Sequence, residues 1–530
     1  MTPPGGVWRD ICAADDILLH AGVCALVEDR QVAIFRTASG FFAIDNRDPA
    51  AGANVLSRGI VGDLQGQLVV ASPLYKHHFN LATGRCLEDP ALGVATWSVR
   101  VREGRIELRA AQLNLARRAA RRRRLVLVGN GMAGLRALEE LLALAPGLYD
   151  VTVFGAETRG GYNRVLLSSV LTGEKTLEDI AGHDRDWYAS RGVTLHAGDP
   201  VLRIDRVRRV VESKAGVRCE YDRLLLATGA SAVALDVPGA SLRGVLRFRN
   251  VDDVEAMLAA AGSGGCAVVI GGGLLGVEAA AGLHGRGMQV TLVHDNDTLM
   301  DRQLDTEAGR LLRESLERRG IVFRMGANTV RIDGTERARS VALDDGSELA
   351  ADLVVTAVGI RPNIGLAASA GLRCDRGILV DDTMQTFDPS IYAIGECVQH
   401  RRTTFGLVAP LWEQARVCAT HLAELGALRY RQSLPAAQLR ISGLQVFSAG
   451  DVRGGDGCES IVLSDPARGI YKRLVLRDNK VQGAVLYGDV ADGARYCELM
   501  REARDVAAVR DALLFDASGS EAVPRSEAAA

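Results

Sequence analysis

The sequence predicts a multidomain protein with an all-β N-terminal domain, two Rossmann-like α/β dinucleotide-binding domains and a small α+β C-terminal domain. Two observations predict the α/β pair. The glycine motif Gly-x-Gly-x-x-Gly follows a short apolar strand and opens a helix at two places in the chain. The length of 530 residues is also too great for one hydrophobic core, so several domains are expected.

The first glycine motif begins after the apolar residues 125–128 and consists of Gly129, Gly131 and Gly134. Glycine is needed first for the tight turn, second so that the backbone can approach a pyrophosphate, and third for close packing of helix and strand. The N-terminus of the following helix favours phosphate groups. The motif therefore predicts a dinucleotide site.

The second glycine motif repeats this pattern, with Gly271, Gly273 and Gly276 after the apolar strand 267–270. Two copies predict two dinucleotides, and the obvious pair is bound FAD and the nicotinamide dinucleotide that reduces it. The longest apolar stretch, 267–283, is explained better by this motif than by a membrane span.

The composition of the chain argues against several classes of function. The formal charge of -2 gives no basic footprint for nucleic acid. The first residues lack a secretory signal, so we expect a cytoplasmic protein with no membrane partner. The ten cysteines form no Cys-x-x-Cys or similar close pair, which disfavours zinc, an iron–sulfur cluster and a catalytic dithiol. A homodimer is compatible with the sequence.

The N-terminal domain, residues 1–110, contains strand-like segments at 23–26, 31–36, 41–44, 67–71 and 97–108. Glycine, proline and Asn/Asp turns separate them, as in a small antiparallel barrel or sandwich. Residues 45–49 and 72–84 resemble the two cluster loops of a Rieske domain. In that family these loops carry Cys-x-His and Cys-x-x-His, because two thiolates and two imidazoles hold the irons.

The matching positions here are Asn46, Asp48, Ser72 and Tyr75. None is a cysteine or histidine, so we expect no iron–sulfur cluster and no metal. Residues 46–90 are similar to the cluster-less Rieske-like small subunit of assimilatory NAD(P)H nitrite reductase. Residues 111–123 then predict a basic, solvated linker, with a docking surface for an acidic partner as the alternative.

The FAD-binding domain is expected in two pieces, 124–244 and 363–429. Glu157 follows the second strand, 151–154, where an acidic residue accepts hydrogen bonds from the adenosine ribose. Residues 160–168, which include Asn163 and Arg164, resemble the loop along the flavin in pyridine nucleotide-disulfide-type reductases. Many relatives have a lysine where this chain has Ser169.

Two further segments carry the same resemblance. Residues 221–229 end in Thr228 and Gly229 and resemble the strand after which such enzymes pass between domains, and 357–363 resembles the return crossing. Residues 386–397 resemble the second flavin-binding strand, where the resemblance implies that Gly395 and Glu396 lie beside the flavin. Most relatives have aspartate at the position of Glu396, whose carboxylate would meet the ribityl hydroxyls.

The NAD(P)-binding domain is expected over 245–362. Glu278 matches a glutamate that in this family often contacts the nicotinamide, with an ordinary helix-face role as the alternative. His294 stands where NAD-preferring relatives place an acid for the ribose 2′-OH, with Asp295, Asp297 and Arg302 nearby. NADH and NADPH both stay open as the substrate. No catalytic residue beyond Glu278 is proposed, because the flavin carries the chemistry.

Residues 430–514 predict a C-terminal reductase domain, and 515–530 a tail. Residues 124–514 are most similar to the N-terminal half of the nitrite reductase large subunit, and 406–411 fit that relation. The full large subunit continues into iron–sulfur and siroheme segments. The resemblance thus implies an electron-input component for a separate siroheme nitrite reductase or molybdenum nitrate reductase. The alternatives are a rubredoxin or ferredoxin reductase, and a non-enzymatic redox sensor or scaffold that binds dinucleotide.

Overall fold

The computed structural model describes residues 8–27, 30–64, 66–89, 92–109, 122–425, 428–431, 434, 436–441 and 443–515. The expected linker, apart from Arg122 and Arg123, and the expected tail beyond Phe515 lie outside the described residues. The described residues form two compact units. One comprises those of Met1–Arg124, Leu138–Asp150 and Val417–Arg429, and the other those of Leu125–Ala137, Val151–Arg416 and Tyr430–Ala530.

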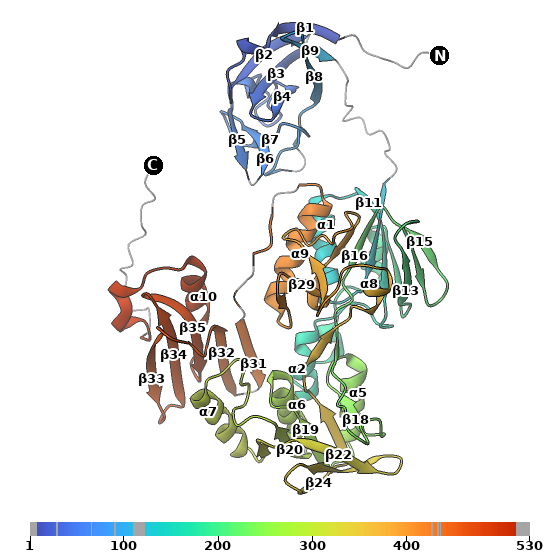
Figure 1. Cartoon of the computed structure of the whole chain (residues 1–530), viewed down its shortest axis with the longest axis vertical. Coiled ribbons are helices and arrows are strands. Elements are labelled where there is room, and N and C mark those ends of the chain that lie inside the picture. The colour runs from blue at the N-terminus through green and yellow to red at the C-terminus, as the bar shows by residue number, and fades with distance from the viewer. Residues whose placement is uncertain are drawn as a thin grey trace. The chain divides into compact units, whose positions relative to one another are not determined.

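The N-terminal domain is all β, as predicted (Figure 1). Its larger sheet is antiparallel, with strand order β1-β9-β8-β4-β3-β2, and a second antiparallel sheet has the order β5-β6-β7. The strands of the larger sheet are β1 (Trp8–Ala13), β2 (Gly22–Val27), β3 (Arg30–Thr37), β4 (Gly40–Asp45), β8 (Thr96–Arg102) and β9 (Arg105–Arg109). Those of the smaller sheet are β5 (Ile60–Leu64), β6 (Gln67–Ala71) and β7 (His78–Asn80).

One strand prediction in this domain was wrong. Residues 97–108 do not form one strand but the hairpin of β8 and β9, in which Val99 pairs with Leu108. Glu103 and Gly104 make the turn, both with positive φ (51° and 75°). The apolar residues on either side of this turn read as one continuous strand, because a two-residue Glu-Gly turn adds only a weak break to the pattern.

The first α/β domain is built on a five-stranded sheet of order β12-β11-β10-β16-β28. The register pairs β10 with β16, β11 with β12 and β16 with β28, all parallel. These strands are β10 (Arg123–Val128), β11 (Tyr149–Gly155), β12 (Val193–Ala197), β16 (Arg223–Leu226) and β28 (Ile391–Ala393). Its helices are α1 (Met132–Leu144), α2 (Leu167–Thr172), α3 (Leu177–Ile180), α4 (Arg185–Ser190), α8 (Gly365–Ser369) and α9 (Val408–Leu422).

Two small sheets complete this domain. One is the antiparallel β13-β14-β15 and the other is β27-β29-β30. Their strands are β13 (Val201–Asp205), β14 (Val210–Ser213), β15 (Arg218–Glu220), β27 (Ile378–Val380), β29 (Val398–His400) and β30 (Thr403–Thr404). The 3₁₀ turns that shape the cavity described below are η3 (Arg164–Leu166) and η4 (Gly395–Cys397).

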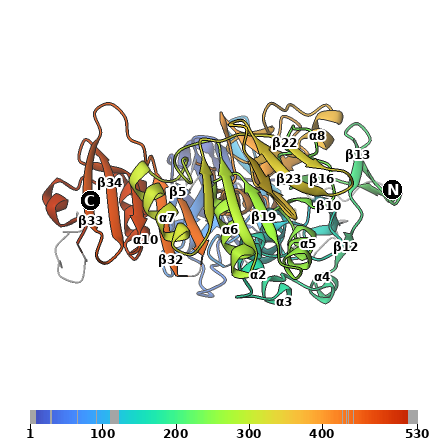
Figure 2. The same cartoon turned by 90° about the horizontal axis from the view of Figure 1, so that it is seen from below.

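The second α/β domain repeats the parallel arrangement, with strand order β18-β25-β19-β20-β21. Figures 1 and 2 show α6 lying against this sheet. The strands are β18 (Val245–Arg247), β19 (Cys266–Ile270), β20 (Gln289–His294), β21 (Val322–Met325) and β25 (Leu353–Thr356), with the added antiparallel strands β22 (Thr329–Gly334), β23 (Ala338–Leu343) and β24 (Glu348–Ala350). The helices are α5 (Val251–Ala261), α6 (Leu274–Gly285) and α7 (Thr306–Glu317).

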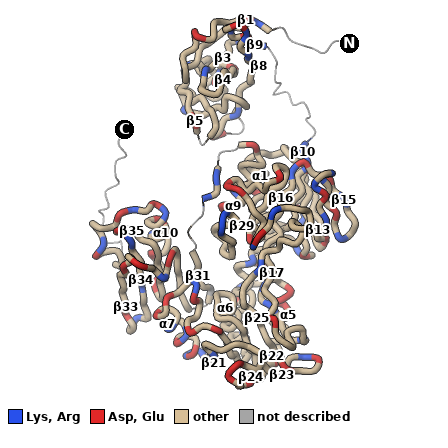
Figure 3. Tube along the Cα trace, in the orientation of Figure 1, with Lys and Arg blue, Asp and Glu red and all other residues tan. Residues whose placement is uncertain are grey.

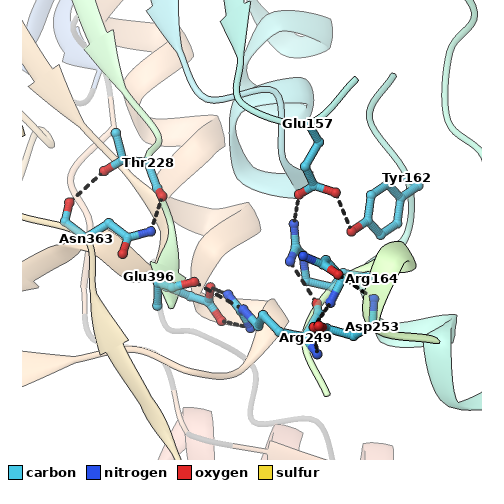
Figure 4. Close-up of polar contacts among 10 residues, drawn as sticks. Glu157, Tyr162, Arg164, Thr228, Arg249, Asp253, Asn363 and Glu396 are labelled. Carbon is cyan, nitrogen blue, oxygen red and sulfur yellow. Dashed lines mark hydrogen bonds and ion pairs between the residues drawn. The ribbon is translucent and has the colours of Figure 1, made fainter. Parts of the chain in front are cut away.

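The chain crosses between the two α/β domains along two paired strands. β17 (Ala230–Ala232) leads out and β26 (Ile360–Pro362) leads back, and they pair antiparallel. Hydrogen bonds between Thr228 and Asn363 hold the two strands together where they leave the first domain. The Thr228 hydroxyl donates to the Asn363 carbonyl oxygen at 2.9 Å, and Asn363 Nδ2 donates to the Thr228 carbonyl oxygen at 2.8 Å (Figure 4).

In its described residues, the C-terminal domain has a five-stranded antiparallel sheet, β31-β32-β35-β34-β33, and one α-helix. Figures 1 and 2 both show α7 beside it, and Tyr471 Oη donates to Asp305 at the start of α7 at 2.5 Å. The elements are β31 (Ala436–Ile441), β32 (Leu444–Gly450), β33 (Glu459–Asp465), β34 (Ile470–Arg477), β35 (Lys480–Tyr487) and α10 (Gly493–Glu502).

Charges of both signs are interspersed along the described chain (Figure 3). Each helix among the described residues is too short or too polar to cross a membrane. All ten cysteines are described and none forms a disulfide.

Candidate functional site

A cavity of about 750 Å³ is lined by residues from both α/β domains and from the C-terminal sheet. The first glycine loop (129–133), the loop after β11, the crossing at 227–232 and η4 come from the first α/β domain. Leu274, Leu275 and Glu278 of α6 come from the second α/β domain, and 436–438 of β31 come from the C-terminal sheet. The cavity therefore lies between the first glycine loop and α6, the helix that begins within the second glycine motif.

The first glycine loop has the geometry that its sequence predicts. Gly129 has a φ of 111°, and a Cβ there would collide with the Ala227 carbonyl oxygen. A Cβ on Gly134 would collide with the Gly129 carbonyl oxygen, so the helix packs directly on the turn. A Cβ on Gly131 would meet nothing within 4 Å. The second glycine alone is thus open, as a backbone needs to be where a phosphate approaches.

The second glycine loop repeats this geometry residue for residue. Gly271 has a φ of 112°, a Cβ on Gly276 would collide with the Gly271 carbonyl oxygen, and a Cβ on Gly273 would again meet nothing within 4 Å. Both first glycines also donate their N–H at 2.8 Å to the neighbouring strand, Gly129 to Phe154 and Gly271 to Val293. The two loops therefore have equivalent backbone geometry.

Glu157 and Arg164 lie together at one part of the cavity wall (Figure 4). Glu157 Oε1 accepts from Arg164 at 2.6 Å, and Oε2 accepts from the Tyr162 hydroxyl at 2.8 Å. Burial and the neighbouring carboxylate raise the pKa of Tyr162 although Arg164 opposes them, so its hydroxyl stays a donor. Asn163, between them, lines the cavity and accepts from the Val165 N–H at 3.2 Å, which starts η3.

Glu396 is held by an arginine that the sequence analysis did not single out. Its two oxygens accept from the two terminal nitrogens of Arg249, with Nη1 and Oε1 3.3 Å apart. The side chains are only 14% and 15% exposed, so this ion pair is largely shielded from solvent. The one sequence signal was the glutamate at a position where the resembling family has aspartate.

The glycine before it, Gly395, has a φ of 91° and donates its N–H at 2.8 Å to Oε1 of Gln414 on α9. Gln414 is fully buried, and sequence reasoning missed it as well. Cys397 follows on the other side of Glu396, but its Sγ donates to the Ile394 carbonyl oxygen at 3.2 Å. Burial raises the pKa of the Cys397 thiol, which keeps it protonated and unreactive.

The second α/β domain brings Glu278 to the cavity but not His294. Glu278 is 4% exposed and lines the cavity from α6. His294 ends β20 with its ring against Gly272, where a Cβ would lie 2.5 Å from Cδ2 of the histidine. Its Nδ1 lies 3.0 Å from Oδ1 of Asp295, whose side chain is 72% exposed. Asp295 is therefore the more accessible side chain at this strand end.

Two buried polar atoms at the cavity wall indicate that the cavity suits a polar ligand. Nδ2 of Asn130 and Oγ of Ser168 have no hydrogen-bond partner among the described residues, and both residues line the cavity. Such orphaned groups are costly unless a ligand or water satisfies them. Together with the open second glycines, they fit a large polar cofactor such as a dinucleotide.

Two of the four Rieske-like positions of the N-terminal domain, Asp48 and Ser72, are joined by a hydrogen bond. Asp48 and Ser72 are fully buried, and the Ser72 hydroxyl donates to Oδ2 of Asp48. Oδ1 of Asp48 accepts from Ala50 N at 2.8 Å, and Oδ1 of Asn46 accepts from Ser57 N at 2.7 Å. Tyr75 is 62% exposed. The described residues contain no group of three or more His, Cys, Asp or Glu side chains placed to hold a metal ion.

Comparison with known protein families divides the chain into three parts. The sequence profile described as pyridine nucleotide-disulphide oxidoreductase matches residues 123–420, more than half of the chain. That of the Rieske-like [2Fe-2S] domain matches 7–109, and that of the rubredoxin NAD+ reductase C-terminal domain matches 435–504. The predicted fold classes of the three parts are thereby confirmed.

Two curated relatives come from Bacillus subtilis (strain 168). The chain is 42% identical over 410 residues to the assimilatory nitrate reductase electron transfer subunit, covering 77% of this chain and 53% of the relative. It is 46% identical over 385 residues to a nitrite reductase [NAD(P)H], covering 73% and 48%. The chain thus spans about half the length of each. Among solved structures, putidaredoxin reductase in its covalent complex with putidaredoxin is 27% identical, with a TM-score of 0.66, covering 72% of this chain and 93% of that one.

Proposed function

Because the chain belongs to the pyridine nucleotide-disulphide oxidoreductase family, we propose that it is an NAD(P)H-dependent FAD oxidoreductase that feeds electrons to a separate protein of nitrite or nitrate assimilation. The observation that carries the proposal is the single cavity that takes residues from both glycine-motif domains. When bound, FAD supplies the hydride-accepting chemistry. The chain's own task is to hold two dinucleotides with their reactive rings in contact.

Each group of site residues is proposed to bind a different part of the two dinucleotides. Gly129, Gly131 and Gly134 would cradle the FAD pyrophosphate, with Glu157 at the adenosine ribose and Asn163, Arg164, Thr228 and Gly229 along the cofactor. Gly395 and Glu396 would meet the ribityl chain. Gly271, Gly273 and Gly276 would hold the nicotinamide dinucleotide, with Glu278 at its nicotinamide and His294 near the second ribose. The open space at Gly131 and Gly273 supports both cradles.

The acceptor is proposed to be a siroheme nitrite reductase or a molybdenum nitrate reductase. The support is the similarity to a nitrate reductase electron transfer subunit and to a nitrite reductase, of which this chain spans about half. The buried, protonated thiol of Cys397 supports the idea that electrons leave through the flavin and not through a thiol beside it. We further propose that the N-terminal domain holds no iron–sulfur cluster. Asp48 and Ser72 occupy two of the four ligand positions of a Rieske domain, and they hydrogen-bond to each other.

Anaerobic oxidation of NADH and NADPH by the purified chain tests the function. Nitrite or nitrate is supplied, with and without the siroheme or molybdenum protein of the same cell. Turnover that starts only when one of those proteins is added is expected, and the ratio of the two kcat/KM values gives the nicotinamide preference. Ammonium formed from nitrite by the single chain would contradict the proposal. Iron and acid-labile sulfide in the pure protein would contradict the cluster-less reading.

A second function is favoured by one observation. Residues 435–504 match the rubredoxin NAD+ reductase C-terminal domain, and β31 of that domain lines the cavity. A chain that reduces a rubredoxin or ferredoxin, but neither assimilation protein, would be a carrier reductase. A non-enzymatic sensor would bind FAD without being reduced by either nicotinamide.

A further inference from the structure

Arg249 stands at the start of the second α/β domain, between β18 and α5. Its backbone N–H donates to Oδ2 of Asp253 at 2.9 Å, next to the capping box that Asn250 and Asp253 form at the start of α5. Its carbonyl oxygen accepts from Nη1 of Arg164 at 2.8 Å. The main chain of Arg249 is therefore fixed from both sides, by the helix cap of one α/β domain and by a cavity-wall arginine of the other.

The side chain of Arg249 reaches back to the first α/β domain at two points (Figure 4). Both terminal nitrogens bind Glu396 on η4, and Nε donates to the Ala230 carbonyl oxygen on the crossing strand β17 at 3.1 Å. A planar guanidinium with its donors in a fixed fork can make all these bonds at once, whereas a lysine ammonium cannot. One side chain thus joins α5, η4 and the crossing.

The surroundings of this ion pair make it costly to break. Arg249 and Glu396 both line the cavity, and their side chains are 14% and 15% exposed. Removal of one partner leaves the other charge buried and unpaired, whereas removal of both avoids that cost. A second arginine–glutamate pair, Arg159 with Glu255 at 2.7 Å, also joins the first α/β domain to α5. Its side chains are 49% and 45% exposed, so it offers a natural comparison.

We propose that Arg249 is a positioning residue for hydride transfer. It holds Glu396 at the cavity wall and fixes the first turn of α5 relative to η4. Because α6 belongs to the same domain as α5, the α6 side chains then reach the cavity at a fixed place. The inference rests on the function proposed above. Its consequence is kinetic, because a reacting pair displaced by about 1 Å loses about 100-fold in rate.

The test compares the full-length wild type with Arg249→Met, Arg249→Lys and the double variant Arg249→Met/Glu396→Gln. Anaerobic rapid mixing with increasing NADH or NADPH separates the limiting rate of flavin reduction from nucleotide affinity. We expect Arg249→Met to lower the limiting rate about 100-fold, with nucleotide affinity changed less than about threefold. Its FAD dissociation constant, measured by flavin fluorescence on the apoprotein, should rise about tenfold.

The double variant separates charge pairing from positioning. In denaturant unfolding its apoprotein should be more stable than that of Arg249→Met, since no unpaired charge is left. It should still be slow in flavin reduction, since the link between the two domains is absent. Arg249→Lys should lie between wild type and Arg249→Met in rate. Glu255→Gln removes the exposed pair and should match wild type in FAD affinity and in rate.

Three results of these variant comparisons would overturn the inference. They are a wild-type reduction rate in Arg249→Met, a double variant whose apoprotein is no more stable than that of Arg249→Met, and a loss of rate in Glu255→Gln as large as that in Arg249→Met. Hydrogen exchange of the apoprotein provides a readout without cofactor. Faster exchange at the start of α5 and at β17 in Arg249→Met than in Glu255→Gln supports the link, and equal exchange rejects it. If wild type itself fails to take up FAD, the proposed function falls while this measurement still decides the role of Arg249.

Discussion

The Ser72 hydroxyl donates a hydrogen bond to the carboxylate of Asp48, and both side chains are fully buried where two loops of the N-terminal domain meet. In a Rieske domain the corresponding positions carry a cluster that ties the two loops together. Here a hydrogen bond between the two side chains joins the loops directly. The contact therefore predicts a stability effect that does not involve electron transfer.

Asp48→Ala should lower the free energy of unfolding of the N-terminal domain by about 1–3 kcal/mol, because the Ser72 hydroxyl and the Ala50 N–H lose their acceptor. Urea unfolding followed by tryptophan fluorescence and thermal unfolding followed by calorimetry measure the effect. FAD content and dye reduction should stay at wild-type levels.

Ser72→Ala and the double variant complete the cycle for this pair. The double variant should be less destabilised than the sum of the two single variants, because the shared hydrogen bond is lost only once. Strict additivity would show that the contact contributes nothing measurable.

Alanine substitutions at two glycines of the first loop should have different effects. Gly134→Ala places a methyl group against the Gly129 carbonyl oxygen and should destabilise the domain by about 1–3 kcal/mol. Gly131→Ala meets open space, so the free energy of unfolding of the apoprotein should change by less than about 0.5 kcal/mol. Its methyl group would instead occupy the cradle, and FAD affinity should fall about tenfold.

Gly276→Ala and Gly273→Ala repeat the comparison in the second cradle, with nicotinamide nucleotide affinity in place of FAD affinity. Titration of FAD into the apoproteins of the first pair, titration of NADH or NADPH into the second pair, and denaturant unfolding of all four variants measure these quantities. Equal FAD affinity in Gly131→Ala and wild type would contradict the proposed cradle.

Glu278→Gln tests the nicotinamide end of the cavity. A buried carboxylate at this place should orient the nicotinamide, so kcat/KM for NAD(P)H should fall about tenfold or more while FAD content is unchanged. Steady-state dye reduction and the flavin absorbance at purification measure the two.

The control for this prediction is Glu314→Gln on α7, which removes an exposed partner of Arg310 in the same domain. It should match wild type in both measurements. An effect of Glu314→Gln as large as that of Glu278→Gln would assign the loss to general damage.

The sequence predicted the backbone geometry of the two glycine loops well, because glycine spacing follows directly from that geometry. Gly129 and Gly271 need a positive φ, and Gly134 and Gly276 leave no room for a Cβ; both requirements follow from local structure. Arg249 was missed for the opposite reason. Its partner Glu396 is 147 residues away in the chain, and no local pattern joins them.

The turn at Glu103 and Gly104 shows a second limit of sequence reasoning. Apolar alternation predicts strands, but it does not reveal a two-residue turn inside a longer apolar stretch. The resemblance to known families supplied what periodicity could not, namely the order of the flavin, nicotinamide and C-terminal parts. The position of His294 against Gly272, away from the cavity lining, depends on packing that neither source describes.

Lys472 predicts a pH dependence in the C-terminal domain. Its Nζ lies 2.6 Å from Oδ2 of Asp489 and 3.0 Å from Oδ2 of Asp492, and the lysine side chain is 5% exposed. The hydrogen bond from Lys472 lowers the pKa of Asp489 below its ordinary 3.8. Burial opposes the charge on Lys472, but the two aspartates outweigh it and raise the lysine pKa above 10.5.

These directions fix the pH window. A lowered aspartate pKa stabilises the fold fully above pH 3.8, and the effect is lost as the pH falls through the folded-state pKa. A raised lysine pKa stabilises fully below pH 10.5, and that effect is lost as the pH rises beyond it. The cluster should therefore be intact from about pH 4 to about pH 10.

Lys472→Met should cost roughly 3 kcal/mol within that window, because Asp492 is left buried without its cation. Below pH 3.8 the difference from wild type should shrink, since Asp489 no longer needs a cation once it is protonated. Denaturant unfolding between pH 3 and pH 8 measures it, with Lys480→Met on the next strand as the control. A penalty that stays constant down to pH 3 would show that Lys472 acts through packing of its alkyl chain and not through its charge.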